Sequence, residues 1–228
     1  MPRHAVIVSH GQPSEPDVGE AEIRALSDAV QAVLPEMRVT GATLAKEGAL
    51  EAAVDSRAGA LVYPFFMADG WFTQKALPKR LEGFEVTQLA PFGLDPALPD
   101  WTADWLRRVL SERGWPAQDT ALFLAAHGSG RSDKPASVTR GFGKALAERM
   151  PFREIRCGFV EEAPYLADMA EGLGERSICL PFFNMKRGHV LDDLPEALDA
   201  VGFAGVRLDP FGCQPELPRF IATALSSA

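Results

Sequence analysis

Three histidines stand where an apolar run gives way to polar residues. His10 lies in "VSHGQP" and His127 in "AAHGSG", while His189 follows "PFFNMKRG". Two carboxylates, Glu161 and Glu162, follow the apolar run "GFV" in the same way. Neutral imidazoles and a carboxylate are ligands that suit divalent cobalt, iron, nickel or zinc. We therefore predict a metal site made of His127, His189 and one of the two glutamates, without a fourth tight protein ligand, so that the ion can exchange.

An internal repeat relates these places to one another. His10 and His127 are 117 residues apart (127 − 10), and "LVYPFF" matches "ICLPFF" at the same offset. "PFGLDPALP" and "PFGCQPELP" repeat at an offset of 119 (210 − 91). Three landmarks that keep their order and spacing indicate a duplication. We place the two halves, and two predicted domains, at 1–115 and 118–228.

Each half alternates short apolar runs with amphipathic segments. Runs such as "HAVIVS" and "TALFLAA" are typical of buried strands. The predicted helices cover residues 19–34, 47–57, 71–81, 96–113, 135–150, 164–173, 193–201 and 217–225. This alternation predicts an α/β fold in which each half is a four-stranded parallel sheet flanked by helices. Ligands of such sheets bind beyond the carboxyl ends of the strands, which is where the three histidines fall.

The halves differ at the positions that matter for metal binding. In the first half Trp71 stands where His189 stands in the second, and Ala45 and Lys46 replace the acidic pair. We therefore predict a degenerate first half in which His10 has a supporting or vestigial role, although it could also face the cleft and contribute to substrate binding. An indole at such a place can stack on a flat apolar ring, although Trp71 would equally serve to fill the space of a lost site.

Basic residues gather around the predicted metal site, on a chain whose net charge is −8. Arg131 and Lys134 follow the first histidine of the predicted pair, and Lys186 and Arg187 precede the second. Four cations on an acidic chain predict a polycarboxylate ligand, held by charge-assisted hydrogen bonds. For each cation alone, an ordinary solvated loop charge is the alternative.

Other function classes fit less well. A nucleophile elbow has glycine two residues before and two residues after its serine, whereas around Ser129 these places hold His127 and Arg131. "GSGRSD" lacks the lysine and spacing of a P-loop, and we find no dinucleotide fingerprint, so we predict no nucleotide cofactor. A pI of about 5.1 argues against a nucleic-acid partner. No apolar stretch is long enough to cross a bilayer, and the opening "MPRHAVIVSHGQP" turns polar too early for a signal peptide, so we expect a cytoplasmic protein with no membrane partner.

The motifs "LFLAAHGS", "GFVEEAP", "PFFNMKRGHVLDDLP" and "PFG", in this order, resemble the class II, ATP-independent chelatases of the sirohydrochlorin cobaltochelatase and ferrochelatase type. The likeness extends over nearly the whole chain. It implies insertion of Co²⁺ or Fe²⁺ into a tetrapyrrole with many carboxylates, in cobalamin and siroheme synthesis. It also implies that His127 and His189 are the metal ligands, that Glu161 is the acidic residue of the site, and that Asp193 belongs to the substrate site.

Two functions remain open at this point. In an enzyme, Glu161 would complete the metal coordination or accept a proton from the ring. The alternative is a non-catalytic tetrapyrrole or metal carrier derived from a chelatase. The duplication supplies both walls of a cleft in one chain, so a monomer would suffice, while a homo-oligomer is equally compatible with the sequence.

Overall fold

The computed structural model describes residues 3–54 and 59–228. They form two compact units. The first unit holds the chain up to Asp95 together with Pro215–Ala228, and the second unit is Pro96–Gln214. Across the described residues, no helix is both long and apolar enough to span a membrane.

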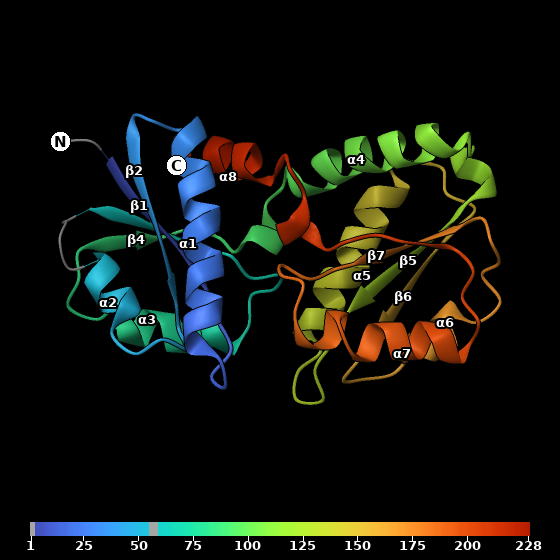
Figure 1. Ribbon diagram of the computed structural model, residues 1–228, viewed down its shortest axis with the longest axis horizontal. Coiled ribbons are helices and arrows are strands. Elements are labelled where there is room, and N and C mark those ends of the chain that lie inside the picture. Colours follow the sequence, from blue (N-terminus) through green and yellow to red (C-terminus); the bar gives the residue numbers. More distant parts are fainter. Residues whose placement is uncertain (1–2, 55–58) are drawn as a thin grey trace. The chain divides into compact units, whose positions relative to one another are not determined.

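In the first unit, four parallel strands form a sheet in the order β2-β1-β3-β4. Helix α1 covers one face with α8 beside it, and Leu50 of α2 and Leu77 of α3 pack on Val6 and Val62 on the other (Figure 1). Burial on both faces explains why the central strand is an unbroken apolar run. The elements are β1 (Arg3–Ser9), α1 (Pro16–Val33), β2 (Met37–Thr43), α2 (Ala49–Val54), β3 (Ala60–Pro64), α3 (Leu77–Arg80), β4 (Val86–Gln88) and α8 (Leu217–Ser226).

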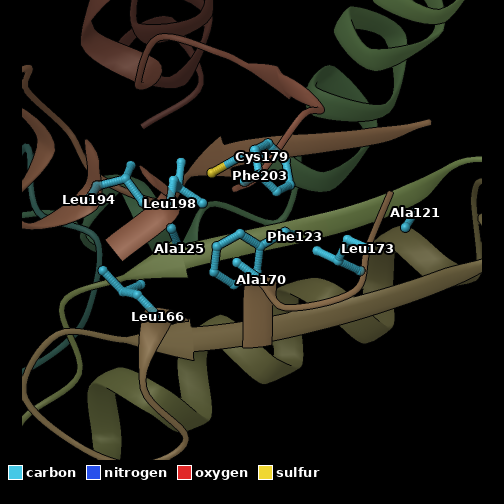
Figure 2. Packing of buried hydrophobic residues seen from close by; sticks show 10 residues of the cluster. All are labelled: Ala121, Phe123, Ala125, Leu166, Ala170, Leu173, Cys179, Leu194, Leu198 and Phe203. Atoms are coloured by element: carbon cyan, nitrogen blue, oxygen red, sulfur yellow. The ribbon is translucent and has the colours of Figure 1, made fainter. Parts of the chain in front are cut away.

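The second unit repeats this plan, with strand order β6-β5-β7-β8. Helix α5 covers one face and contacts α4. On the other face Phe123 of β5 packs among Leu166 and Ala170 of α6 and Leu198 of α7, whose side chains point toward one another in Figure 2. The elements are α4 (Leu98–Arg113), β5 (Ala121–Ala126), α5 (Lys134–Ala147), β6 (Glu154–Phe159), α6 (Leu166–Ala170), β7 (Ser177–Pro181), α7 (Asp193–Ala200) and β8 (Val206–Arg207).

The predicted fold class is confirmed: each unit is a four-stranded parallel sheet flanked by helices. The eight predicted helices all correspond to helical segments, with ends shifted by a few residues. Of the helix predicted at 47–57, residues 55–57 lie outside the described part of the chain.

The compact units do not coincide with the sequence halves 1–115 and 118–228. Helix α4 comes from the first half but belongs to the second unit, where Trp105 meets Phe211 with ring centroids 6.0 Å apart. Helix α8 belongs to the first unit, where Phe220 meets Phe92 at 5.7 Å. The halves follow the repeat, whereas the units exchange their closing helices. Apolar periodicity fixes which face of a helix is buried, but not which of two similar sheets buries it.

Candidate metal centre

Strand β5 carries His127 to the carboxyl edge of the second unit's sheet. All of Ala121–Ala126 is buried, and His127 is the first exposed residue after it. The chain then turns at Gly128, whose φ of 69° lies in the left-handed region. A β-carbon there would stand 2.9 Å from side-chain carbons of Phe159 and Glu162. Glycine therefore lets this turn lie directly against the end of β6.

The acidic pair follows β6, the neighbour of β5. The backbone N–H of Glu161 donates to the His127 carbonyl oxygen at 2.9 Å, which fixes the two strand ends side by side. The carboxylate of Glu162 accepts a hydrogen bond from the Ser129 N–H at 2.8 Å. Glu162 is thus engaged with the loop after β5, whereas Glu161 is exposed.

His189 lies beyond β7, in the short 3₁₀ turn Gly188–Val190 that precedes α7. Its Nδ1 donates to Oδ2 of Asp193 at 2.7 Å. Asp193 begins α7, so one helical turn separates the two side chains. The structure therefore places Asp193, which we had predicted to contact substrate, against His189, where it orients the imidazole.

The three predicted ligands lie close together. The rings of His127 and His189 are perpendicular, with centroids 4.6 Å apart. One donor atom from each of His127, Glu161 and His189 lies within 4.8 Å of the others. They converge because β6, β5 and β7 are adjacent parallel strands whose carboxyl ends share one edge of the sheet.

In both imidazoles Nε2 is the nitrogen that can act as an acceptor, because Nδ1 is engaged elsewhere. Nδ1 of His127 lies 3.0 Å from the Gly128 carbonyl oxygen. A carbonyl or carboxylate oxygen can only accept, so Nδ1 carries the hydrogen in both His127 and His189. A neutral imidazole of this tautomer keeps its lone pair on Nε2, and a hydrogen bond from Nδ1 is the usual support of a metal-binding histidine.

The spacing suits one ion after a small adjustment. Donors held at about 2.1 Å from a common ion lie no more than about 4.2 Å apart. The exposed side chains of His127 and Glu161 can close the remaining distance by rotation. Among the described residues the cluster contains no cysteine, and burial raises the pKa of Cys157 to about 11 and that of Cys179 to about 12.

The four predicted cations differ in their surroundings. Arg131 and Lys134 are exposed around the start of α5, close in sequence to His127. Lys186 instead pairs with Asp209 at 2.6 Å, and that carboxylate raises the pKa of Lys186 above its ordinary value. Arg131 and Lys134 are therefore better candidates for binding a carboxylate than Lys186. Arg187 is half-buried in the loop before the 3₁₀ turn.

The corresponding place in the first unit has lost the donor set. The N–H of Ala45 donates to the His10 carbonyl oxygen at 2.9 Å, so Ala45 occupies the backbone position of Glu161. Phe72 lies against the His10 ring with centroids 4.2 Å apart, where the second unit has an imidazole. We had predicted Trp71 as the counterpart of His189. Phe72 takes that place, in keeping with the repeat offset of 117 (189 − 72).

Comparisons with known proteins agree with the motif resemblance. A family model described as CbiX matches residues 121–228, which include the whole donor cluster. The chain is 43% identical to a solved structure described as CbiX, the terminal enzyme for biosynthesis of siroheme in denitrifying bacteria; the match covers 99% of each chain with a TM-score of 0.89. The chain belongs to the CbiX family.

More distant relatives include one solved structure that shares the fold of this CbiX-family chain. SirB from Bacillus subtilis, solved with Fe³⁺, matches with a TM-score of 0.77 at 16% identity, covering 100% of this chain and 95% of SirB. A probable sirohydrochlorin cobaltochelatase from Halobacterium salinarum is 23% identical over 161 residues. That match covers 59% of this chain and 55% of the relative, so the chain spans only about half of its length.

Glu162 is a residue whose part at the site the sequence did not reveal, since either glutamate could have been the ligand. Replacing it with alanine (Glu162→Ala) is expected to weaken Co²⁺ binding about tenfold, because the loop bearing His127 loses its support at Ser129. Glu162→Gln keeps an oxygen that can accept from the Ser129 N–H, and is expected to stay within about threefold of wild type. Titration with Co²⁺ alone measures both. An equal loss of Co²⁺ affinity in the two variants would indicate that the Glu162 carboxylate itself binds the ion.

Proposed function

We propose that this chain inserts a divalent metal ion, cobalt or iron, into a polycarboxylate tetrapyrrole such as sirohydrochlorin, without nucleotide. The observation that carries the proposal is the cluster of His127, Glu161 and His189, with both imidazoles offering Nε2. Two neutral nitrogens and one exposed carboxylate bind such an ion without enclosing it, so the ion can be passed on. Nickel and zinc suit the same donors. The CbiX relative acts in the biosynthesis of siroheme and the H. salinarum relative is a probable sirohydrochlorin cobaltochelatase, and both support this choice of substrate.

The reaction exchanges one divalent ion for two pyrrole N–H protons. His127 and His189 hold the ion while ring nitrogens replace the protein donors one after another. Four metal–nitrogen bonds form in all, and the two ring nitrogens that carried hydrogen each give up one proton. Glu161, once it leaves the ion, accepts one proton, and water accepts the second. Asp193 keeps His189 in the tautomer that binds the ion.

Substrate carboxylates require cations near this exchange. Arg131 and Lys134 are exposed close in sequence to His127, and we assign them to peripheral carboxylates of the ring. Lys186 and Arg187 lie in the loop after β7. We assign them a secondary role in binding the carboxylates, since Lys186 must first leave Asp209. The net charge of −8 makes a local group of cations the natural anchor for an anionic ligand.

The proposal is tested by turnover with the metal and the ring both in large excess over protein. We expect the absorbance of sirohydrochlorin to change with Co²⁺ until many rings per protein molecule are metallated, well above the rate without protein. A change that stops at one ring per protein would identify a carrier. No change above the protein-free rate would remove the proposed function.

A further inference from the structure

Two aromatic side chains of the first unit are exposed where the loop after β3 enters a helical segment. Trp71 is 66% exposed and Phe72 37%. Large apolar side chains in contact with water are common singly, but neighbouring ones on a fixed loop are typical of a binding surface. This pair stands at the carboxyl edge of a parallel sheet, where ligands of such folds bind.

Four rings form one connected cluster here, which we call the aromatic platform: His10, Phe66, Trp71 and Phe72. Phe72 is at its centre, with ring centroids 4.2 Å from His10, 6.2 Å from Phe66 and 5.1 Å from Trp71. The His10 ring is itself fixed, since its Nδ1 donates to the Gly11 carbonyl oxygen at 2.6 Å. The exposed rings therefore rest on a supported base.

The backbone that carries the platform is also held. The hydroxyl of Thr73, only 1% exposed, donates to Asp69 at 2.8 Å and accepts from the Gly70 N–H at 3.0 Å. Gln88 donates to the Thr73 carbonyl oxygen at 2.8 Å. Phe72 and Thr73 belong to the π-helix Phe72–Ala76, a rare local form often found at functional sites. Rings held in advance lose little conformational entropy when a ligand binds.

The platform occupies the place that the metal centre occupies in the second unit. His10 matches His127, Ala45 matches Glu161 and Phe72 matches His189 in the repeat. Two of three donors have become apolar, so this place no longer suits an ion. It now presents ring faces and ring edges to a ligand.

We propose that the aromatic platform binds the flat face of the tetrapyrrole ring before metal is present, an inference that rests on the proposed function. The size of the surface favours a small planar ligand. Trp71 and Phe72 together expose on the order of 200 Å², far less than the roughly 800 Å² that each partner contributes to a specific protein interface. The exposed faces and edges of these rings can make offset-stacked or edge-to-face contacts with a conjugated macrocycle.

The test measures binding of metal-free sirohydrochlorin by its own fluorescence anisotropy, with no metal added. In Trp71→Ala/Phe72→Ala we expect the Kd for the ring to rise about tenfold, the loss of one to two aromatic contacts. Trp71→Phe keeps a ring and is expected to retain most of the affinity. Val18→Ala/Val33→Ala removes exposed apolar side chains from α1 of the same unit and is expected to change nothing.

Readouts separate this inference from the proposed function. Co²⁺ affinity, measured with the metal alone, is expected to be unchanged in the platform variant, because the donors lie in the second unit. Wild-type ring affinity in Trp71→Ala/Phe72→Ala would overturn the platform while leaving turnover intact. If ring binding depends on the platform but the protein shows no turnover, the inference about the platform is supported and the proposed enzymatic function is rejected. Self-association of wild type that the double variant abolishes would identify a second copy as the occupant and overturn the inference.

Discussion

His189→Ala is expected to lower the rate of cobalt insertion into sirohydrochlorin by more than about 100-fold. The variant removes one of two imidazole donors and leaves His127 and Glu161 as the only members of the cluster. Water would have to replace the lost nitrogen, and the ion would then be held too loosely to be presented to the ring. The cobalt-dependent absorbance change measures the rate, and a Co²⁺ titration without ring measures the affinity.

A graded variant distinguishes loss of a ligand from loss of folding. Asp193→Asn keeps an oxygen for the Nδ1–H of His189 but removes the negative charge. We expect its rate to fall by about 10-fold, between wild type and His189→Ala, because outer partners of a metal-binding histidine tune rather than supply the bond. Wild-type rates in His189→Ala would end the assignment of the metal centre.

Much of the candidate metal centre could be predicted from the sequence because strand ends are easy to locate. A buried apolar run of about six residues stops where the first polar residue appears, and parallel strands share their carboxyl edge. His127 follows such a run directly, and Glu161 follows the shorter apolar run "GFV" at the end of β6, so their convergence needed no further information. His189 follows its strand by eight residues (189 − 181), and its position depends on the turn and on Asp193.

What could not be predicted depends on contacts between segments. Each closing helix packs an aromatic side chain on a phenylalanine of a "PFG" motif, Phe220 on Phe92 and Trp105 on Phe211, and the repeat gives no sign of which helix each motif receives. The pairing of Lys186 with Asp209 joins loops that are 23 residues apart (209 − 186). The place of Phe72 beside His10 could have been predicted, since the repeat offset of 117 aligns Phe72 with His189. We instead aligned the neighbouring Trp71, one residue away.

The "PFG" motif predicts the second large effect, this time on stability. Gly212 lies where the turn after β8 packs on the loop after β7, and the N–H of Phe211 donates to the Phe183 carbonyl oxygen at 3.2 Å. A β-carbon on Gly212 would overlap the carbonyl oxygen of Asn184. The contact is backbone against backbone, so no side chain can move aside, and Gly212→Ala is expected to cost about 3 kcal/mol or more.

A helical glycine of the same unit provides the matched control. A β-carbon on Gly141, inside α5, would meet nothing within 4 Å. Gly141→Ala is therefore expected to stabilise by about 0.5–1 kcal/mol, because alanine costs less conformational entropy in a helix. Thermal and urea unfolding measure both variants. A wild-type melting temperature for Gly212→Ala would contradict the close approach of the two loops.

The same substitution links stability to the metal centre. Asn184 begins the segment that leads to His189, so a shift of its backbone is passed along five residues (189 − 184) to the imidazole. Gly212→Ala is accordingly expected to weaken Co²⁺ binding even at temperatures where the protein remains folded, whereas Gly141→Ala leaves it unchanged. A folded Gly212→Ala protein with wild-type Co²⁺ affinity would show that the 3₁₀ turn and the His189–Asp193 hydrogen bond hold the His189 imidazole in place independently of this loop.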